Sequence, residues 1–187
     1  MYAVTLMCNP SQPILTKKLI SKYYIIFEGS SLIWLRDGIA VEIKTSIFPK
    51  EFLKHRIKLQ ELNIDSVLQK DKSRKKKLLI ADMDSTIIEQ ECLDELATEI
   101  GFEAEIKNIT KAAMKGEINF ETALRDRVSY LKGAPTSTIT KVFTNRISIA
   151  SGARTLLATM KKNNAYTALI SGGFTHFTSH IAADLGF

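Results

Sequence analysis

The pattern of hydrophobic and polar positions changes after about residue 70 of the 187-residue chain. Before that point, short apolar runs rich in aromatic and β-branched residues alternate with hairpin-type breaks at Gly29–Ser31 and Asp37–Gly38. We interpret these runs as strands: YAVTLMC, the three runs within YYIIFEGSSLIWLRDGIAVEI, and DSVLQ. PKEFLKHRIKLQELNI has apolar residues at helical spacing and begins with a proline, which suits the first position of a helix. Residues 1–70 are therefore predicted to form a small α+β domain.

From Leu78 onward the pattern is that of an α/β protein. LLIADMD is a nearly continuous apolar run, as expected for a strand buried on both faces of a parallel sheet. A helical region follows, and it is divided by Gly101, Gly116, Gly133 and Pro135. The remaining segments predict a helix in GARTLLATMKKNNA, a second buried strand in AYTALIS and a last helix in THFTSHIAADLG. We therefore predict an α/β domain over residues 78–187, with a parallel sheet and a helical cap of about residues 90–149 inserted after the first strand.

Between these blocks lies a basic run that accounts for part of the net charge of +6. KDKSRKKK can attract nucleic acid or an anionic surface, but no aromatic residues interleave with it and no nucleic-acid-binding motif follows. We interpret residues 71–77 as a solvated linker, and we expect neither nucleic acid nor a membrane as a partner.

Cysteine content and the N-terminus bear on the compartment. Cys8 and Cys92 are too few for a disulfide framework, and neither has a His or Cys partner at metal-binding spacing. We expect both thiols to be reduced, which fits a cytoplasmic protein. No apolar run approaches the length of a membrane span, and the N-terminus lacks the basic region of a signal peptide. The oligomeric state remains open.

The candidate chemistry lies where the two predicted parallel strands end. The first ends in Asp82 and Asp84, and the second ends in Ser171-Gly172-Gly173. Open α/β sheets bind their ligands at the carboxyl ends of their strands. One carboxylate can attack phosphorus while the other carries a proton, Mg²⁺ prefers oxygen ligands, and a hydroxyl with glycine amides suits phosphate oxygens. The pattern predicts a phosphate site beside a divalent cation.

DMDST and SGGF resemble the first and second motifs of the haloacid-dehalogenase (HAD) superfamily, in its phosphoserine phosphatase branch. The resemblance extends almost continuously over residues 78–187, through ECLDELA, ITKAAMKGEINFETALRDRVSYLKG and ALISGGFTHFT. It implies a HAD-like domain that hydrolyses O-phospho-L-serine through an aspartyl phosphate with Mg²⁺, the last step of serine biosynthesis. Residues 1–70 resemble only the general habit of bacterial members, which carry a small α+β domain before the catalytic one.

The resemblance also implies roles for single residues. Asp82 would be the nucleophile and a Mg²⁺ ligand, and Asp84 the general acid/base, whose backbone carbonyl would bind the metal. The implied substrate-binding residues are Glu91 and Arg127 for the amino and carboxylate groups, Ser171 and Gly172 for the phosphate, Gly173 through its backbone, and Met114 and Phe120 as the closing face of the cap.

Helical spacing supports Arg127 independently of the resemblance. An apolar stripe is formed by Phe120, Ala123, Leu124, Val128 and Leu131, and Arg127 falls within it. A charge on a buried face usually has a partner, so both a substrate carboxylate and a core acid are candidates. Arg125 lies off the stripe, four residues after Glu121, and we expect a surface pair between these two.

Three further residue types are less specific. Glu91 taken alone fits a solvated first-turn acid as well as a ligand. His176 and His180 have metal-binding spacing, but no third ligand accompanies them, so we expect no metal there. Cys92 is expected to be a small packing residue of the cap rather than a nucleophile.

Two motifs that normally follow the second motif in this superfamily have no counterpart among these residues. They are a lysine that stabilises phosphate charge and a G-D-G-x-N-D stretch that completes the metal site. The strand bearing the latter packs beside the first strand, so its lack predicts an exposed apolar edge at residues 78–81. We therefore expect a C-terminally truncated chain that is nearly inactive alone. Other functions left open are a phosphatase for another small phosphomonoester, a non-enzymatic module that binds a ligand or partner, and a nucleic-acid binder.

Overall fold

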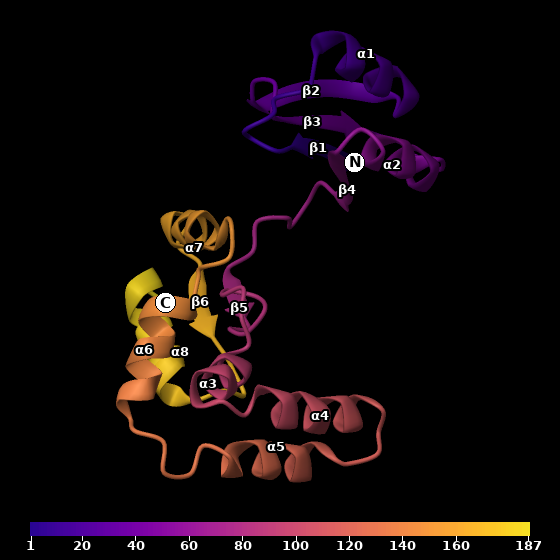
Figure 1. Ribbon diagram of the computed structural model, residues 1–187. Coiled ribbons are helices and arrows are strands. Elements are labelled where there is room, and N and C mark those ends of the chain that lie inside the picture. Colours follow the sequence, from indigo (N-terminus) through magenta and orange to yellow (C-terminus); the bar gives the residue numbers. More distant parts are fainter. The chain divides into compact units, whose positions relative to one another are not determined.

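The computed structural model describes residues 1–187, which form two compact units, Met1–Lys75 and Lys76–Phe187 (Figure 1). The first unit is built on an antiparallel sheet, and the second on a pair of parallel strands with helices around it. None of the helices combines the length and the apolar character needed to cross a membrane.

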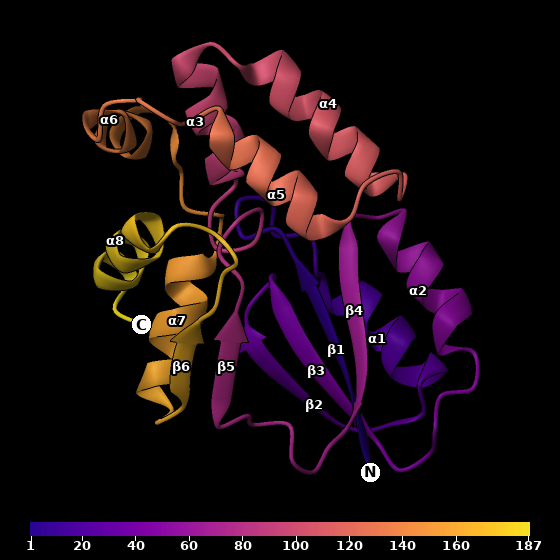
Figure 2. The same ribbon diagram turned by 90° about the horizontal axis from the view of Figure 1, so that it is seen from below.

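The sheet of the first unit has the strand order β2-β3-β1-β4 (Figure 2). Its elements are β1 (Tyr2–Cys8), α1 (Lys17–Ile26), β2 (Gly29–Arg36), β3 (Ala40–Thr45), α2 (Phe52–Gln60) and β4 (Ile64–Lys70). Alternate residues of β1 and β3, such as Leu6 and Ile43, are fully buried and pack with Ile20 of α1 and Leu59 of α2. One face of the sheet and both helices therefore share a single core.

The first of the three runs interpreted as strands, YYIIF, is instead the end of α1 and the residue after it, so that prediction was wrong. Thr16 caps this helix by accepting a hydrogen bond from the amide of Leu19 at 3.2 Å. Ile20, Tyr23 and Phe27 recur at helical spacing, and all three are buried. This spacing overrides the β-propensity of the tyrosines and isoleucines, because it gives the helix one apolar face for the sheet.

The other elements expected in this block are present, with shifted boundaries. The expected break at Gly29–Ser31 is the start of β2, and α2 ends at Gln60 rather than at Ile64, which begins β4. Helix α2 begins at Phe52 rather than at Pro49. The carbonyl of Pro49 accepts a hydrogen bond from the amide of Phe52 at 3.0 Å, so the proline opens a turn that leads into the helix.

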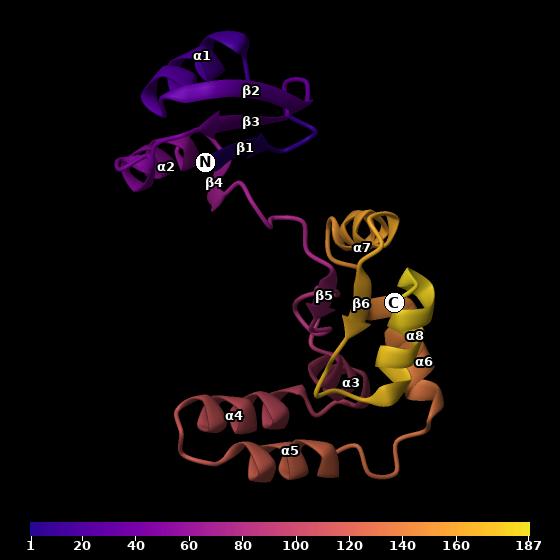
Figure 3. The ribbon, with the colours of Figure 1, turned by 180° about the vertical axis from the view of Figure 1, so that it is seen from behind.

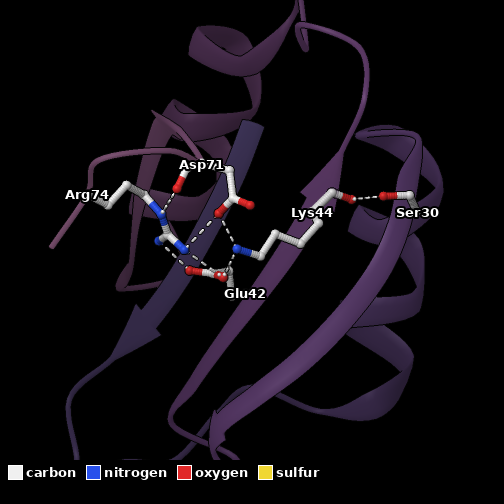
Figure 4. Close-up of polar contacts among 5 residues, drawn as sticks. All are labelled: Ser30, Glu42, Lys44, Asp71 and Arg74. Atoms are coloured by element: carbon white, nitrogen blue, oxygen red, sulfur yellow. Dashed lines mark hydrogen bonds and ion pairs between the residues drawn. The ribbon is translucent and has the colours of Figure 1, made fainter. Parts of the chain in front are cut away.

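Four charged residues form a network on the opposite face of this sheet (Figure 4). Arg74 donates to both carboxylate oxygens of Glu42, at 2.5 and 2.9 Å, and to Asp71 at 3.1 Å. Lys44 pairs with Glu42 at 2.7 Å and also with Asp71. Glu42 is only 6% exposed. Residues 71–74 were interpreted as part of a solvated linker, but two of them are bonded to the sheet. Arg74 supplies a cationic partner to the buried carboxylate of Glu42, and Asp71 pairs with Lys44 of β3.

The second unit contains the strands β5 (Leu78–Ala81) and β6 (Tyr166–Leu169), which pair in parallel. In the chain, helix α7 (Ala153–Lys162) precedes β6 and helix α8 (Thr175–Leu185) follows it. This arrangement confirms the predicted α/β fold class. Burial of β5 on both faces was expected, but Leu78 and Ile80 are 52% and 59% exposed, whereas Ala81 is buried. Tyr166, the partner of Leu78, is exposed on the same face. One face of the strand pair is therefore uncovered and apolar.

Four helices lie between β5 and α7, as predicted for the cap: α3 (Cys92–Ile100), α4 (Glu103–Met114), α5 (Phe120–Ser129) and α6 (Ser137–Arg146). Helices α4 and α5 lie side by side (Figures 1 and 3). Gly101 ends α3 with a φ of 83°, a backbone conformation that strains other residues. The connections into and out of the cap meet at an antiparallel bridge between Ile88 and Ile149.

Candidate active site

The parallel pairing of β5 and β6 brings their carboxyl ends together, and a cavity of about 220 Å³ opens there. Its walls come from the two strand ends and from cap helices α3 and α5. The cavity is lined by Asp82, Asp84, Glu91, Cys92, Leu93, Phe120, Leu124, Arg127, Ser171, Gly172, Gly173 and Phe174. The candidate residues from both strand ends thus share one cavity with Glu91 and Arg127.

A tight turn after β5 presents the two aspartates. Met83, between them, is fully buried, and its carbonyl accepts hydrogen bonds from the amides of Ile87 and Ile88 at 2.9 and 3.0 Å. Asp82 Oδ1 accepts a hydrogen bond from the amide of Met83 at 2.8 Å. Burial of the central side chain therefore turns both flanking carboxylates toward the cavity.

Asp84 is held between the cap and the loop after β6. Its Oδ1 accepts a hydrogen bond from the backbone amide of Cys92 at 3.1 Å. On the other side lies Gly173, where a Cβ atom would come within 3.0 Å of Asp84 Oδ2 and 3.1 Å of Ser171 Oγ. The amide of Gly173 donates to Ser171 Oγ at 2.9 Å. Glycine at position 173 is what lets the loop approach the carboxylate this closely.

Glu91 and Arg127 face the cavity from the cap. Glu91 directly precedes α3, and its Oε1 accepts a hydrogen bond from Ser85 Oγ at 2.6 Å. Arg127 on α5 uses its Nε to donate to the carbonyl of Ala123 at 3.2 Å. No acid lies within ion-pair distance of Arg127 anywhere in the chain, so the core acid considered as its partner is not present. The guanidinium is a charge at the cavity wall without a protein counter-charge.

Of the two residues expected to close the cap over the substrate, only one lines the cavity. Phe120 lines the cavity although it is largely exposed, whereas Met114 is 84% exposed and is not part of the lining. Arg125 pairs with Glu121 at 2.9 Å, which confirms the expected surface pair. Leu93, Leu124 and Phe174 also line the cavity and were not singled out as site residues. Leu124 belongs to the apolar stripe and Phe174 to SGGF, so both could have been found there.

Cys92 and the pair His176 and His180 were also considered in the sequence as candidate reactive groups. Burial raises the pKa of the Cys92 thiol, and the nearby Asp84 raises it further, so the thiolate is disfavoured. His180 Nδ1 lies 2.7 Å from the backbone carbonyl oxygen of His176, a contact within the helix. No group of three or more His, Cys, Asp or Glu residues in the chain is arranged to hold a metal ion. The oxygen donors at Asp82 and Asp84 suit Mg²⁺ in type, but they are only part of a ligand set.

A family model described as haloacid dehalogenase-like hydrolase matches residues 76–187, more than half of the chain. The chain belongs to the haloacid dehalogenase-like hydrolases. Within this family, a phosphoserine phosphatase of Archaeoglobus fulgidus is 40% identical over 129 residues, which cover 68% of this chain and 37% of that protein.

Solved structures named as phosphoserine phosphatases also match this chain. A structure titled as a phospho-aspartyl intermediate analogue of phosphoserine phosphatase matches 61% of this chain and 54% of that chain, with 42% identity and a TM-score of 0.55. A probable phosphoserine phosphatase from Vibrio cholerae matches 100% of this chain and 56% of that chain, with 25% identity and a TM-score of 0.74. The chain spans 37%, 38% and 53% of the length of three curated relatives that it matches.

Proposed function

We propose that this hydrolase chain carries the nucleophile and the substrate-recognition residues of a phosphoserine phosphatase, which converts O-phospho-L-serine to L-serine and phosphate. The observation that carries the proposal is the unpaired guanidinium of Arg127, which faces the same cavity as the carboxylates of Asp82 and Asp84. A phosphate ester that also bears a carboxylate would supply its missing counter-charge. The names of the relatives point to the same substrate.

The two aspartates are proposed to act in sequence. An oxygen of Asp82 attacks phosphorus and forms an aspartyl phosphate, while the bond from phosphorus to the serine oxygen breaks. Asp84 gives a proton to the departing alkoxide, then takes one from the water that attacks the aspartyl phosphate and releases phosphate. The backbone amide of Cys92 donates to Asp84 Oδ1. Asp84 Oδ2, the oxygen near Gly173, is therefore the one left to carry the proton.

The remaining residues are proposed to bind and orient the substrate. The hydroxyl of Ser171 and the amides at Gly172 and Gly173 suit the phosphate oxygens. Glu91 would take the ammonium group and Arg127 the carboxylate, since an anion and a cation both line the cavity. Mg²⁺ bound to the Asp82 carboxylate and the Asp84 backbone carbonyl would neutralise charge on the phosphate.

The first test is phosphate release from phosphoserine with and without Mg²⁺, beside the Asp82→Asn variant. Release that needs Mg²⁺ and vanishes in the variant supports the proposal. If the chain releases no phosphate, its affinity for phosphoserine decides whether the substrate site is present. Absence of both release and binding contradicts the proposal.

A pair of arginines on one helix tests the substrate class. Arg127→Ala should weaken phosphoserine binding about tenfold or more, because a charged hydrogen-bonding partner is lost. O-phosphoethanolamine has no carboxylate, so its affinity should be unchanged. Arg125→Ala is the matched control, since Arg125 is exposed and pairs with Glu121. Equal effects on both ligands would favour a phosphatase for a different phosphomonoester.

A further inference from the structure

The two segments that connect the cap to the core are joined by the side chains of Glu89 and Gln90, which both contact Ser148. Besides the bridge between Ile88 and Ile149, the amide of Glu89 donates to the carbonyl of Ser148 at 3.0 Å. Gln90 then uses both ends of its side-chain amide on Ser148. Its Oε1 accepts from the Ser148 backbone amide and its Nε2 donates to Ser148 Oγ, each at 2.9 Å. These two residues are 58 positions apart.

Gln90 also lies within the loop that shapes the candidate site. Its carbonyl accepts a hydrogen bond from the amide of Ser85 at 3.1 Å, which closes the loop after Asp84. The next residue is Glu91, which contacts Ser85 Oγ, and the one after it is Cys92, whose amide holds Asp84. A displacement of Gln90 would therefore shift the carboxylate of Glu91 and the partner of Asp84 together.

We propose that Gln90 is a positioning residue that fixes the start of α3 against the returning connection of the cap, and so sets the places of Glu91 and Asp84 in the cavity. The inference rests on the proposed function in one respect, the role of Glu91 toward the amino group of the substrate. The amide oxygen of Gln90 accepts from the Ser148 backbone amide, and its nitrogen donates to the Ser148 hydroxyl. A carboxylate at position 90 would keep the first contact but could only accept from the hydroxyl. The carboxylate of Glu91 is held by Ser85 Oγ, and the backbone amide of the same serine donates to the carbonyl of Gln90.

A purely structural role for Gln90 makes a different prediction from a positioning role. Inorganic phosphate needs only the Asp82 and Ser171–Gly173 end of the cavity. Phosphoserine also needs Glu91. If Gln90 positions Glu91, its loss lowers the affinity for phosphoserine more than the affinity for inorganic phosphate. If it only stabilises the connection, both affinities fall equally or neither changes.

The experiment compares Gln90→Ala with Gln90→Glu, which keeps the acceptor for the Ser148 amide. Gln60→Ala is the matched control, because Gln60 is an exposed glutamine at the end of α2 in the other unit. Hydrogen exchange is measured at the backbone amides of Ser148 and Cys92. Affinities for phosphoserine and inorganic phosphate are measured in the Asp82→Asn background, which blocks the first chemical step.

Gln90→Ala should raise exchange at both amides and weaken phosphoserine binding about three- to tenfold, the range expected for one or two lost hydrogen bonds. Inorganic phosphate binding should change less than about twofold, and Gln90→Glu should restore much of the protection at Ser148. Unchanged exchange, or equal weakening of both ligands, would overturn the inference. If the Asp82→Asn protein binds neither ligand, the proposed function has failed, and exchange at Cys92 alone decides whether Gln90 positions the partner of Asp84.

Discussion

The backbone amide of Cys92, at the start of α3, donates a hydrogen bond to Asp84 Oδ1 over 3.1 Å. An amide in the first turn of a helix has no partner within the helix, and a carboxylate is well suited to that place. The contact therefore satisfies the cap helix and orients the candidate acid/base at the same time. A residue of the cap and a residue of the strand end share one bond at the centre of the site.

This contact separates the chemical from the structural role of Asp84. In Asp84→Asn, the amide oxygen still accepts from Cys92, so the free energy of unfolding should change by less than about 1 kcal/mol. Proton transfer is lost, so the weak phosphate release expected of this chain alone should fall about 100-fold or more, to background. Urea unfolding and a phosphate-release assay on the same preparation measure both. Turnover equal to that of the parent chain would rule out the acid/base role.

Gly172 and Gly173 differ in the room that each leaves for a side chain. A Cβ at position 173 would come within 3.0 Å of Asp84 Oδ2, whereas one at position 172 would meet nothing within 4 Å. Gly173→Ala should therefore lower the free energy of unfolding by about 1 kcal/mol or more, the usual effect of overpacking. Gly172→Ala should be neutral or slightly stabilising, since alanine reduces the entropy of the unfolded chain. Thermal unfolding of both variants makes the comparison, and equal stabilities would contradict it.

The network around Glu42 should make the first unit sensitive to acid. Burial alone would raise the pKa of Glu42, but hydrogen bonds from Arg74 and Lys44 outweigh it and hold that pKa below its usual 4.5. The hydrogen bond from Lys44 likewise lowers the pKa of Asp71 from 3.8. A lowered folded-state pKa contributes stability above the unfolded value, and this stability is lost as the pH falls through the folded value. The stability of this unit should therefore decline once the pH drops below about 4.5.

Glu42→Gln tests this network at neutral pH. It should lower the stability of the first unit by about 1 to 3 kcal/mol and flatten its acid dependence, because the arginine and lysine lose their buried anion. The single tryptophan, Trp34, packs at the core of this unit and reports its unfolding by fluorescence. Glu51→Gln is the control, since its pairs with Lys54 and His55 are longer and more exposed. Similar losses in the two variants would argue against a special role for the network.

The uncovered face of β5 and β6 should make the chain self-associate. Leu78, Ile80 and Tyr166 are exposed together, and β5 pairs with β6 alone, which leaves its other edge without a partner strand. Ile80→Lys should reduce association in sedimentation velocity. Ile25→Lys, at an exposed isoleucine at the end of α1, should not. A chain that stays monomeric at high concentration would contradict this expectation.

The candidate site residues could be predicted from the sequence because each group of them follows a recognisable short segment. Asp82 with Asp84 and Ser171 with the glycines each follow directly on a short apolar strand, and the parallel arrangement then places both groups at one edge. Arg127 was visible as a charge inside an apolar stripe. The structure brings all of these into one cavity.

Other features depend on distant or ambiguous positions. Gln90 with Ser148, and Glu42 with Arg74, are side-chain pairs between remote segments, and no local periodicity marks them. The short apolar run YYIIF fits a strand and a helix equally well. The helix forms because Thr16 caps its start and its apolar face packs on the sheet. The run at Leu78–Ala81 likewise shows that it is apolar, but not which of its faces is covered.

The bridge between Ile88 and Ile149 joins the two ends of the cap at one point of the core. Because its entry and exit points are bonded neighbours, the cap is a module whose two ends meet, and such insertions place little geometric demand on their host. Replacing the cap with a short turn between these positions would leave the backbone path of the strand pair unchanged. A cap of different length could therefore be inserted at this point while Asp82 and Ser171 keep their places at the strand ends.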